Sequence, residues 1–189
     1  MPASGIELSG RPLIFVPDTE IQRIPFFKGH PISPPVKMSS NSFNKMSSMV
    51  RDFALFSNFQ FLKIPLYRMY NNDMFDGLRM RFWEPVLAQK LPIYIVSPLF
   101  GIIWPGELGG PYYVSMEEMF YVWRQSKLWE TTLEIYDRCK CDRVISFLPQ
   151  SYNNAVFAEG LPWFQYDPDN FFESLHILKG SARNFKDLR

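Results

Sequence analysis

Three short apolar runs, each followed by a proline or a polar residue, restrict the folds open to this chain. They are Pro12–Val16 (PLIFV), Ile93–Ser97 (IYIVS) and Arg143–Leu148 (RVISFL). Runs of this length, rich in β-branched and aromatic residues, predict buried strands. The long segments between them leave room for crossover helices. The sequence therefore predicts an α/β fold, with a mostly parallel sheet and helices on both faces.

Two of the intervening segments have the apolar spacing of helices. Residues 43–56 repeat apolar side chains at helical spacing, which predicts a helix packed on the sheet. Residues 115–140 predict one long amphipathic helix. At its start, Ser115 and Glu118 have the spacing of a capping box, in which each side chain binds the backbone of the other residue.

Length and composition favour a single domain over residues 1–189, in which residues 1–10 form a loose leader. Hydrophobic residues make up 47% of the chain, which is enough for a substantial core. Two segments rich in proline and glycine, residues 25–35 and 98–111, are predicted to be loops.

The net charge and the few cysteines and histidines argue against two classes of partner, nucleic acids bound by overall charge and structural zinc ions. The formal net charge is +1, from 20 basic and 19 acidic residues, so a nucleic-acid partner would require a local basic patch. Cys139 and Cys141 are the only cysteines, and there are two histidines, so the chain offers no ligand set for a structural zinc ion. We expect neither a metal nor a cofactor.

The longest apolar stretch is unsuited to a membrane. It runs from Leu91 to Trp104 and is interrupted by Pro92, Pro98 and Gly101, so it does not predict a spanning helix. The first residues lack the basic and apolar regions of a signal peptide. We therefore predict a cytoplasmic protein with no membrane partner.

The predicted topology also indicates where a ligand would bind. In open parallel sheets, ligands bind beyond the carboxyl ends of the strands. The loops at those ends are residues 17–19, 97–101 and 150–154, and we expect them to converge.

Three segments in and beside these loops resemble the YaaA-type peroxide-stress family. Residues 97–116 (SPLFGIIWPGELGGPYYVSM) resemble the family pattern S-x-L-Y-G-L-L-x-P-x-D followed by P-Y-R-L-x-M. Phe100 and Glu107 stand where the family has tyrosine and aspartate. Residues 70–78 (YNNDMFDGL) and 151–156 (SYNNAV) are similar to two further family segments. The matching residues are Tyr70, Asp73, Gly77, Leu78, Ser97, Leu99, Gly101, Pro105, Pro111, Tyr112, Met116, Ser151, Tyr152, Ala155 and Val156.

The resemblance implies a stress-response protein that binds nucleic acid or a nucleotide at the carboxyl ends of the strands. Family members are associated with limiting peroxide damage and with DNA binding in a positively charged cleft. In this chain Trp104 and Tyr113 replace two family arginines, Asn72 replaces a glycine, and Asp18 lies where the family has a P-A-K run. The ligand-binding candidates are Tyr70, Asn72, Ser97, Phe100, Gly101, Tyr112, Ser151 and Tyr152.

Two alternatives stay open at the level of sequence. The runs SPLFG and DRVISFLP are also similar to a domain of archaeosine synthase, which implies an enzyme acting on a nucleoside or nucleobase by N-glycosidic or transglycosylase-like chemistry. Its catalytic carboxylate would be Asp73 or Glu107. In the other alternative, a protein-interaction module, the glycine- and proline-rich loop has only an architectural role. The sequence does not predict an oligomeric state.

Overall fold

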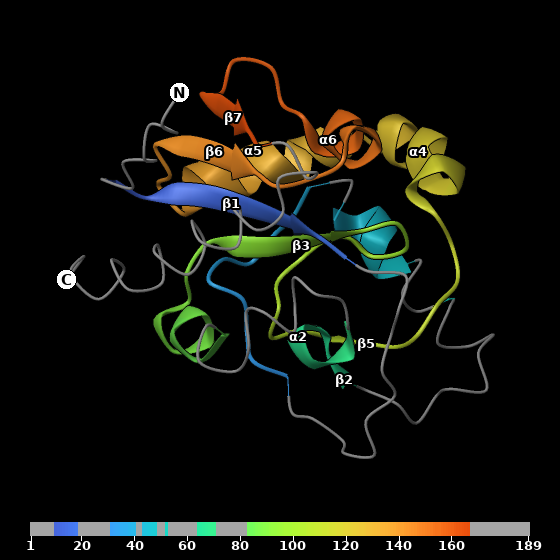
Figure 1. Ribbon diagram of the computed structural model, residues 1–189, viewed down its shortest axis with the longest axis horizontal. Helices are drawn as coiled ribbons and strands as arrows, with labels where there is room; N and C mark the ends of the chain where they lie inside the picture. The colour runs from blue at the N-terminus through green and yellow to red at the C-terminus, as the bar shows by residue number, and fades with distance from the viewer. Residues whose placement is uncertain are drawn as a thin grey trace, which may run out of the picture.

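The computed structural model describes residues 10–18, 31–40, 43–48, 52, 64–70 and 83–166. Within these residues, five strands form the main sheet in the order β4-β3-β1-β6-β7, and two more form a small antiparallel sheet (Figure 1). The strands of the main sheet are β1 (Pro12–Pro17), β3 (Ile93–Ser97), β4 (Gly101–Ile103), β6 (Arg143–Ser146) and β7 (Trp163–Gln165), and those of the small sheet are β2 (Ile64–Pro65) and β5 (Leu108–Gly109).

Parallel pairing dominates the main sheet. β1 lies between β3 and β6 and is parallel to both, and β6 is parallel to β7. Only the edge strand β4 runs antiparallel, against β3. The prediction of an α/β fold with a mainly parallel sheet is confirmed, and its three predicted strands are β1, β3 and β6.

β4 corrects one part of the sequence prediction, because it lies within residues 98–111, which were expected to be loop throughout. Ser97 pairs with Gly101 across a tight turn, and Gly101 adopts a φ of 70°, which favours glycine. A Cβ at this position would also approach the side chains of Leu128 and Trp123 to 3.1 and 3.2 Å. The turn sends the chain back along β3. The short strands β2, β5 and β7 were likewise not predicted, and β5 also lies within the expected loop.

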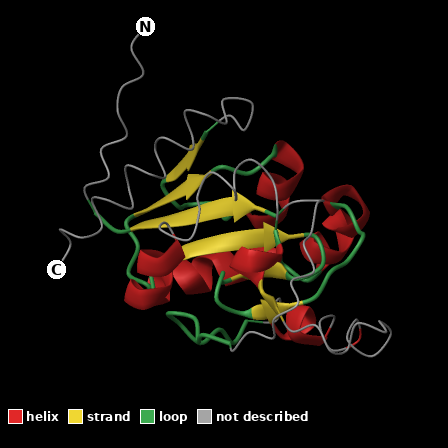
Figure 2. Cartoon of the chain, turned by 60° about the horizontal axis from the view of Figure 1, so that its bottom comes forward, coloured by secondary structure: helices red, strands yellow, loops and turns green. Residues whose placement is uncertain are grey.

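Successive side chains of the central strands enter two separate cores. Ile14 and Val16 pack on one face, with residues of α2 (Leu66–Met69) and of helical residues 83–89. Leu13 and Phe15 pack on the other, against α4 (Met116–Gln125), α5 (Leu128–Arg138) and α6 (Gln150–Val156). Helices therefore cover both faces of the sheet, as the sequence predicted; Figure 2 shows them around the strands.

The long helix predicted over residues 115–140 is in fact two helices. α4 ends at Gln125 and α5 begins at Leu128, because Lys127 between them is left-handed, with a φ of 55°. The Ser126 hydroxyl and the Ser126 backbone N–H both donate to the Val122 carbonyl oxygen, at 2.9 and 3.0 Å, so Ser126 closes the last turn of α4. A pattern of apolar spacing does not reveal such a break, because both helices bury their apolar side chains in the same core.

The predicted capping box at the start of α4 is confirmed. The Ser115 hydroxyl accepts the Glu118 N–H at 3.2 Å, and the Glu118 carboxylate accepts the Ser115 N–H at 2.7 Å. We expect Ser115→Ala to lower the free energy of unfolding by about 1 kcal/mol. Urea denaturation would measure the change. Ser115→Asp, which keeps an oxygen acceptor, should retain most of the stability, and an equal loss in both variants would contradict the capping role.

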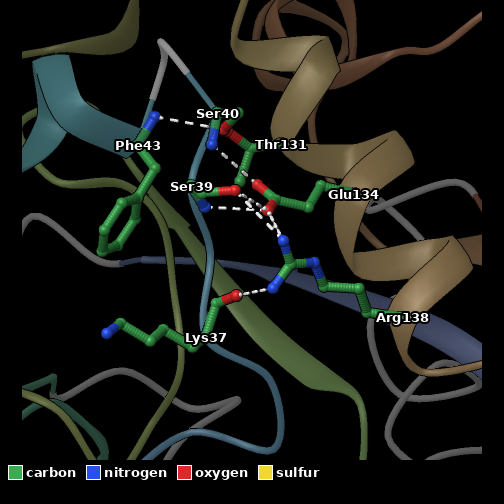
Figure 3. Close-up of polar contacts among 7 residues, drawn as sticks. All are labelled: Lys37, Ser39, Ser40, Phe43, Thr131, Glu134 and Arg138. Carbon is green, nitrogen blue, oxygen red and sulfur yellow. Dashed lines mark hydrogen bonds and ion pairs between the residues drawn. The ribbon is translucent and has the colours of Figure 1, made fainter.

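Glu134 of α5 anchors residues 39 and 40, which precede the helical residues 43–48 (Figure 3). Its carboxylate accepts the backbone N–H groups of Ser39 and Ser40 at 2.7 and 2.9 Å, and it forms an ion pair of 2.9 Å with Arg138. Burial alone would raise the pKa of Glu134, but these hydrogen bonds and the Arg138 charge lower it overall. The Ser40 hydroxyl in turn accepts the Phe43 N–H at 3.3 Å. Residues 31–40 are irregular, which confirms the described part, residues 31–35, of the loop predicted over residues 25–35, and these hydrogen bonds hold the segment in place.

Candidate functional site

Polar side chains from distant parts of the chain meet at the carboxyl edge of the main sheet. Asp18 follows β1, and its N–H continues the strand by donating to the Val96 carbonyl oxygen at 3.0 Å. Ser97 is the last residue of β3, and Tyr152 lies in α6, which follows β6. Tyr112 comes from the loop between β5 and α4. The three loops predicted to converge, residues 17–19, 97–101 and 150–154, therefore each contribute a polar side chain to this edge of the sheet.

A hydrogen-bond network centred on the Asp18 carboxylate joins these residues. The Tyr112 hydroxyl donates to Oδ2 of Asp18, and the Tyr152 hydroxyl donates to Oδ1 at 2.7 Å. The Ser97 Oγ lies 2.6 Å from the Tyr112 Oη, and the Tyr70 Oη lies 3.2 Å from the same oxygen. All but Tyr152 are buried, Asp18 being 8% exposed.

The direction of the protons follows from the number of donors. Tyr112 has one hydroxyl hydrogen, and because Asp18 accepts it, Ser97 and Tyr70 must donate to the Tyr112 oxygen. Burial is the main cause that raises the pKa of Tyr70, Tyr112 and Tyr152, and the negative charge of Asp18 raises each further. The tyrosines therefore remain neutral donors at physiological pH.

Local packing holds α6 where Tyr152 can reach Asp18. Asn153, the next residue in α6, accepts a hydrogen bond of 2.5 Å from the Ser146 hydroxyl at the end of β6. The Asn153 side-chain amide also donates to the Leu148 carbonyl oxygen at 3.3 Å. Because both partners are buried, the start of α6 is fixed to the strand that precedes it.

A cavity of about 490 Å³ opens beside this network. Asp18, Tyr112 and Tyr152 line it, and Tyr113 extends at its edge with 94% of its surface exposed. The charged side chains among its described lining residues are all acidic, namely Asp18, Glu117 and Glu118. The cavity therefore favours a neutral or cationic ligand over a phosphate group.

The structure brings five of the eight predicted ligand-binding residues to this network or its cavity. Four of them share the hydrogen bonds described above, and Ser151 lines the cavity. Phe100 is buried behind Tyr112, with its ring edge-on at 5.2 Å between centroids, and Gly101 serves the β3–β4 turn. The five residues are Tyr70, Ser97, Tyr112, Ser151 and Tyr152.

Glu107, one of the two predicted carboxylates, stands apart from this site and lines a different cavity. The other, Asp73, lies outside the described residues, as does Asn72. Glu107 is separated because β4 runs back along β3, away from the carboxyl edge. Consistent with this direction, the indole Nε1 of Trp104 donates to the carbonyl oxygen of Leu91, just before β3 begins.

The carboxylate that the structure does place at the site, Asp18, was missing from the predicted site residues. Its loop was expected to contribute, but no role was assigned to its side chain. The sequence signal that could have identified Asp18 is its position directly after β1, a buried strand of a parallel sheet, where ligand-binding residues commonly lie. The tyrosine partners that make Asp18 noteworthy lie 94 and 134 positions away, beyond the reach of a local pattern.

The burial of Glu107 should make the free energy of unfolding depend on pH. Burial raises the pKa of its carboxyl from 4.5 to about 7, against a smaller lowering by the Trp104 N–H. Because the folded protein favours the protonated form, the stabilisation from this group is complete below pH 4.5 and disappears as the pH rises through 7.

We expect wild type to lose about 3 kcal/mol relative to Glu107→Gln between these pH values. Urea denaturation of both proteins from pH 4.5 to 8 would measure the difference. A difference that stays constant with pH would contradict the raised pKa.

The described residues offer no obvious metal site. Among them, no group of three or more histidine, cysteine, aspartate or glutamate side chains is arranged to hold an ion. Cys139 and Cys141 are buried free thiols. Nor does this part of the chain contain a helix with the length and apolar character needed to span a membrane.

The chain matches no protein-family model, and no curated protein sequence is significantly similar to it.

Proposed function

We propose that the protein binds a nucleoside or free nucleobase at the carboxyl edge of its main sheet, with the Asp18 carboxylate accepting hydrogen bonds from the ring. The supporting observation is that two tyrosine hydroxyls orient this carboxylate beside a cavity of about 490 Å³. A cavity of this volume is typical of small-molecule sites. A carboxylate has about four acceptor positions, and the Tyr112 and Tyr152 hydroxyls use two of those of Asp18.

The groups around the cavity suit the edges and faces of a base. Nucleobases present amino and ring N–H donors, which carboxylates accept in base recognition. Tyr113 offers an exposed aromatic face at the cavity edge, on which a planar ring can stack. Ser151 and Tyr152 add hydroxyl groups within the same lining.

Charge favours a nucleoside over a nucleotide or a nucleic acid. A phosphate at this cavity would face Asp18, Glu117 and Glu118, and no described lining residue carries a positive charge. The YaaA-type role in peroxide stress, with DNA as ligand, rests on the sequence resemblance alone. The replacement of a family arginine by Tyr113 agrees with the acidic lining, because Tyr113 is one of the lining residues.

Calorimetric titration with the four common ribonucleosides and their 5′-monophosphates tests this proposal. We expect at least one nucleoside to bind more tightly than its monophosphate, and Asp18→Asn to weaken it by about 10-fold or more. The matched control is Asp137→Asn, because Asp137 is exposed on α5. If no nucleoside or base binds, or if Asp18→Asn binds as tightly as wild type, the proposal fails.

A second candidate function is cleavage or exchange of an N-glycosidic bond. The observation that favours it is again Asp18, a buried carboxylate held beside neutral tyrosines, which suits stabilisation of positive charge developing on a sugar. In this reading Asp18 takes the role first assigned to Asp73 or Glu107. Chromatography of incubated nucleosides would detect the released base. Release by Asp18→Asn at the wild-type rate would exclude it.

A further inference from the structure

A second cavity, of about 650 Å³, shares no described lining residue with the first. Residues 31–34 and 43–47 contribute one wall, and the end of β4 and start of β5 contribute the other. Most of its lining is apolar. The apolar residues that matter here are Ile32, Pro34, Phe43, Met46, Ile103 and Leu108.

Both walls are held by hydrogen bonds. The Ile32 N–H donates to the Gly106 carbonyl oxygen at 3.0 Å, which joins the 31–34 segment to the turn that carries Glu107. Glu134 holds the chain a few residues later through Ser39 and Ser40 (Figure 3). The cavity therefore lies between anchored segments.

Glu107 is the one ionisable side chain in the described lining. Its Oε2 accepts the Trp104 N–H at 2.8 Å, while Oε1 has no hydrogen-bond donor among the described residues. A half-buried carboxylate that has no cation among the described lining residues of its cavity is poorly solvated there, and an incoming positive charge would compensate it. Burial raises the pKa of Glu107, which agrees with a carboxylate that lacks a compensating positive charge in this cavity.

We propose that this cavity binds a small organic amine, in which the protonated nitrogen pairs with the Glu107 carboxylate and the apolar body contacts Ile32, Phe43 and Ile103. Charge complementarity selects an ammonium group over a neutral hydroxyl, because only the ammonium supplies the missing counter-charge. The apolar lining selects a hydrocarbon or aromatic body over a polar one. This site is independent of the nucleoside site at Asp18.

Calorimetry at pH 7 with 2-phenylethylamine and 2-phenylethanol tests the proposal, because the two probes have the same shape and differ in charge. We expect wild type to prefer the amine by about 10-fold to 100-fold. Glu107→Gln should bind both probes about equally. Asp137→Asn, which changes an exposed carboxylate on α5 outside both cavities, should keep the wild-type preference.

Two further measurements keep the test independent of how well Glu107→Gln folds. Titrations in two buffers of different ionisation enthalpy should show proton release by wild type when the amine binds, because the ligand charge promotes ionisation of Glu107. Ile32→Lys, at a position 38% exposed, should weaken the amine more than the alcohol. Equal affinity of wild type for both probes, or an amine preference that survives Glu107→Gln, would overturn the proposal.

Discussion

Replacing Asp18 with alanine is expected to lower the free energy of unfolding by about 3 to 5 kcal/mol and to remove the nucleoside binding proposed above. The substitution leaves the buried Tyr112 hydroxyl and the half-buried Tyr152 hydroxyl without their acceptor. Each unsatisfied buried hydroxyl costs about 1 to 3 kcal/mol, and the ligand loses its carboxylate at the same time. Chemical denaturation and calorimetric titration measure the two effects separately.

The matched control for Asp18 is Asp137→Ala, since Asp137 is exposed and should change stability by no more than about 0.5 kcal/mol. Tyr152→Phe tests one arm of the network, because it removes a single hydroxyl and keeps the ring. It should have a smaller effect than Asp18→Ala. If Asp18→Ala were as stable as the control, the hydrogen-bond network would not contribute to the fold.

The second large effect is expected at Trp123, in α4. Trp123 is fully buried, and its indole Nε1 donates to the Pro98 carbonyl oxygen at 2.6 Å. Trp123→Ala should lower the free energy of unfolding by about 3 to 5 kcal/mol, because it leaves a cavity in the core and an unpaired carbonyl. Since Pro98 directly follows Ser97, the change should also loosen the β3–β4 turn and weaken ligand binding at Asp18.

Tyr121 in the same helix provides the control for Trp123. It is also aromatic but 74% exposed, so Tyr121→Ala should stay within about 0.5 kcal/mol of wild type. Urea denaturation of the three proteins would show the contrast. Similar losses at both positions would mean that helix propensity, rather than core packing, dominates in α4.

Much of the scaffold was predictable from local pattern. The runs that became β1, β3 and β6 are apolar on both faces because parallel central strands are covered on both sides. The capping box at Ser115 was readable because its two partners lie three residues apart. That polar groups from several loops would gather at the carboxyl edge followed from a topological rule that depends only on strand order and direction.

Three features were not predictable from the spacing of apolar residues. The left-handed Lys127 divides what the apolar spacing presents as one helix. The direction of β4 depends on pairing with β3, and it moves Glu107 away from Ser97. Asp18 carries no local motif, and its tyrosine partners reach it only when β5, α4 and α6 have folded around the sheet.

By itself, the sequence determined the three strands β1, β3 and β6, the helix start at Ser115 and the edge of the sheet where polar loops gather, since each depends on contacts between near neighbours or on strand order. Tertiary structure alone decided which carboxylate occupies that edge. Hydrogen bonding requires groups to approach within about 3 Å, and for Asp18 and Glu107 the path of the folded chain, not their spacing in sequence, sets that distance.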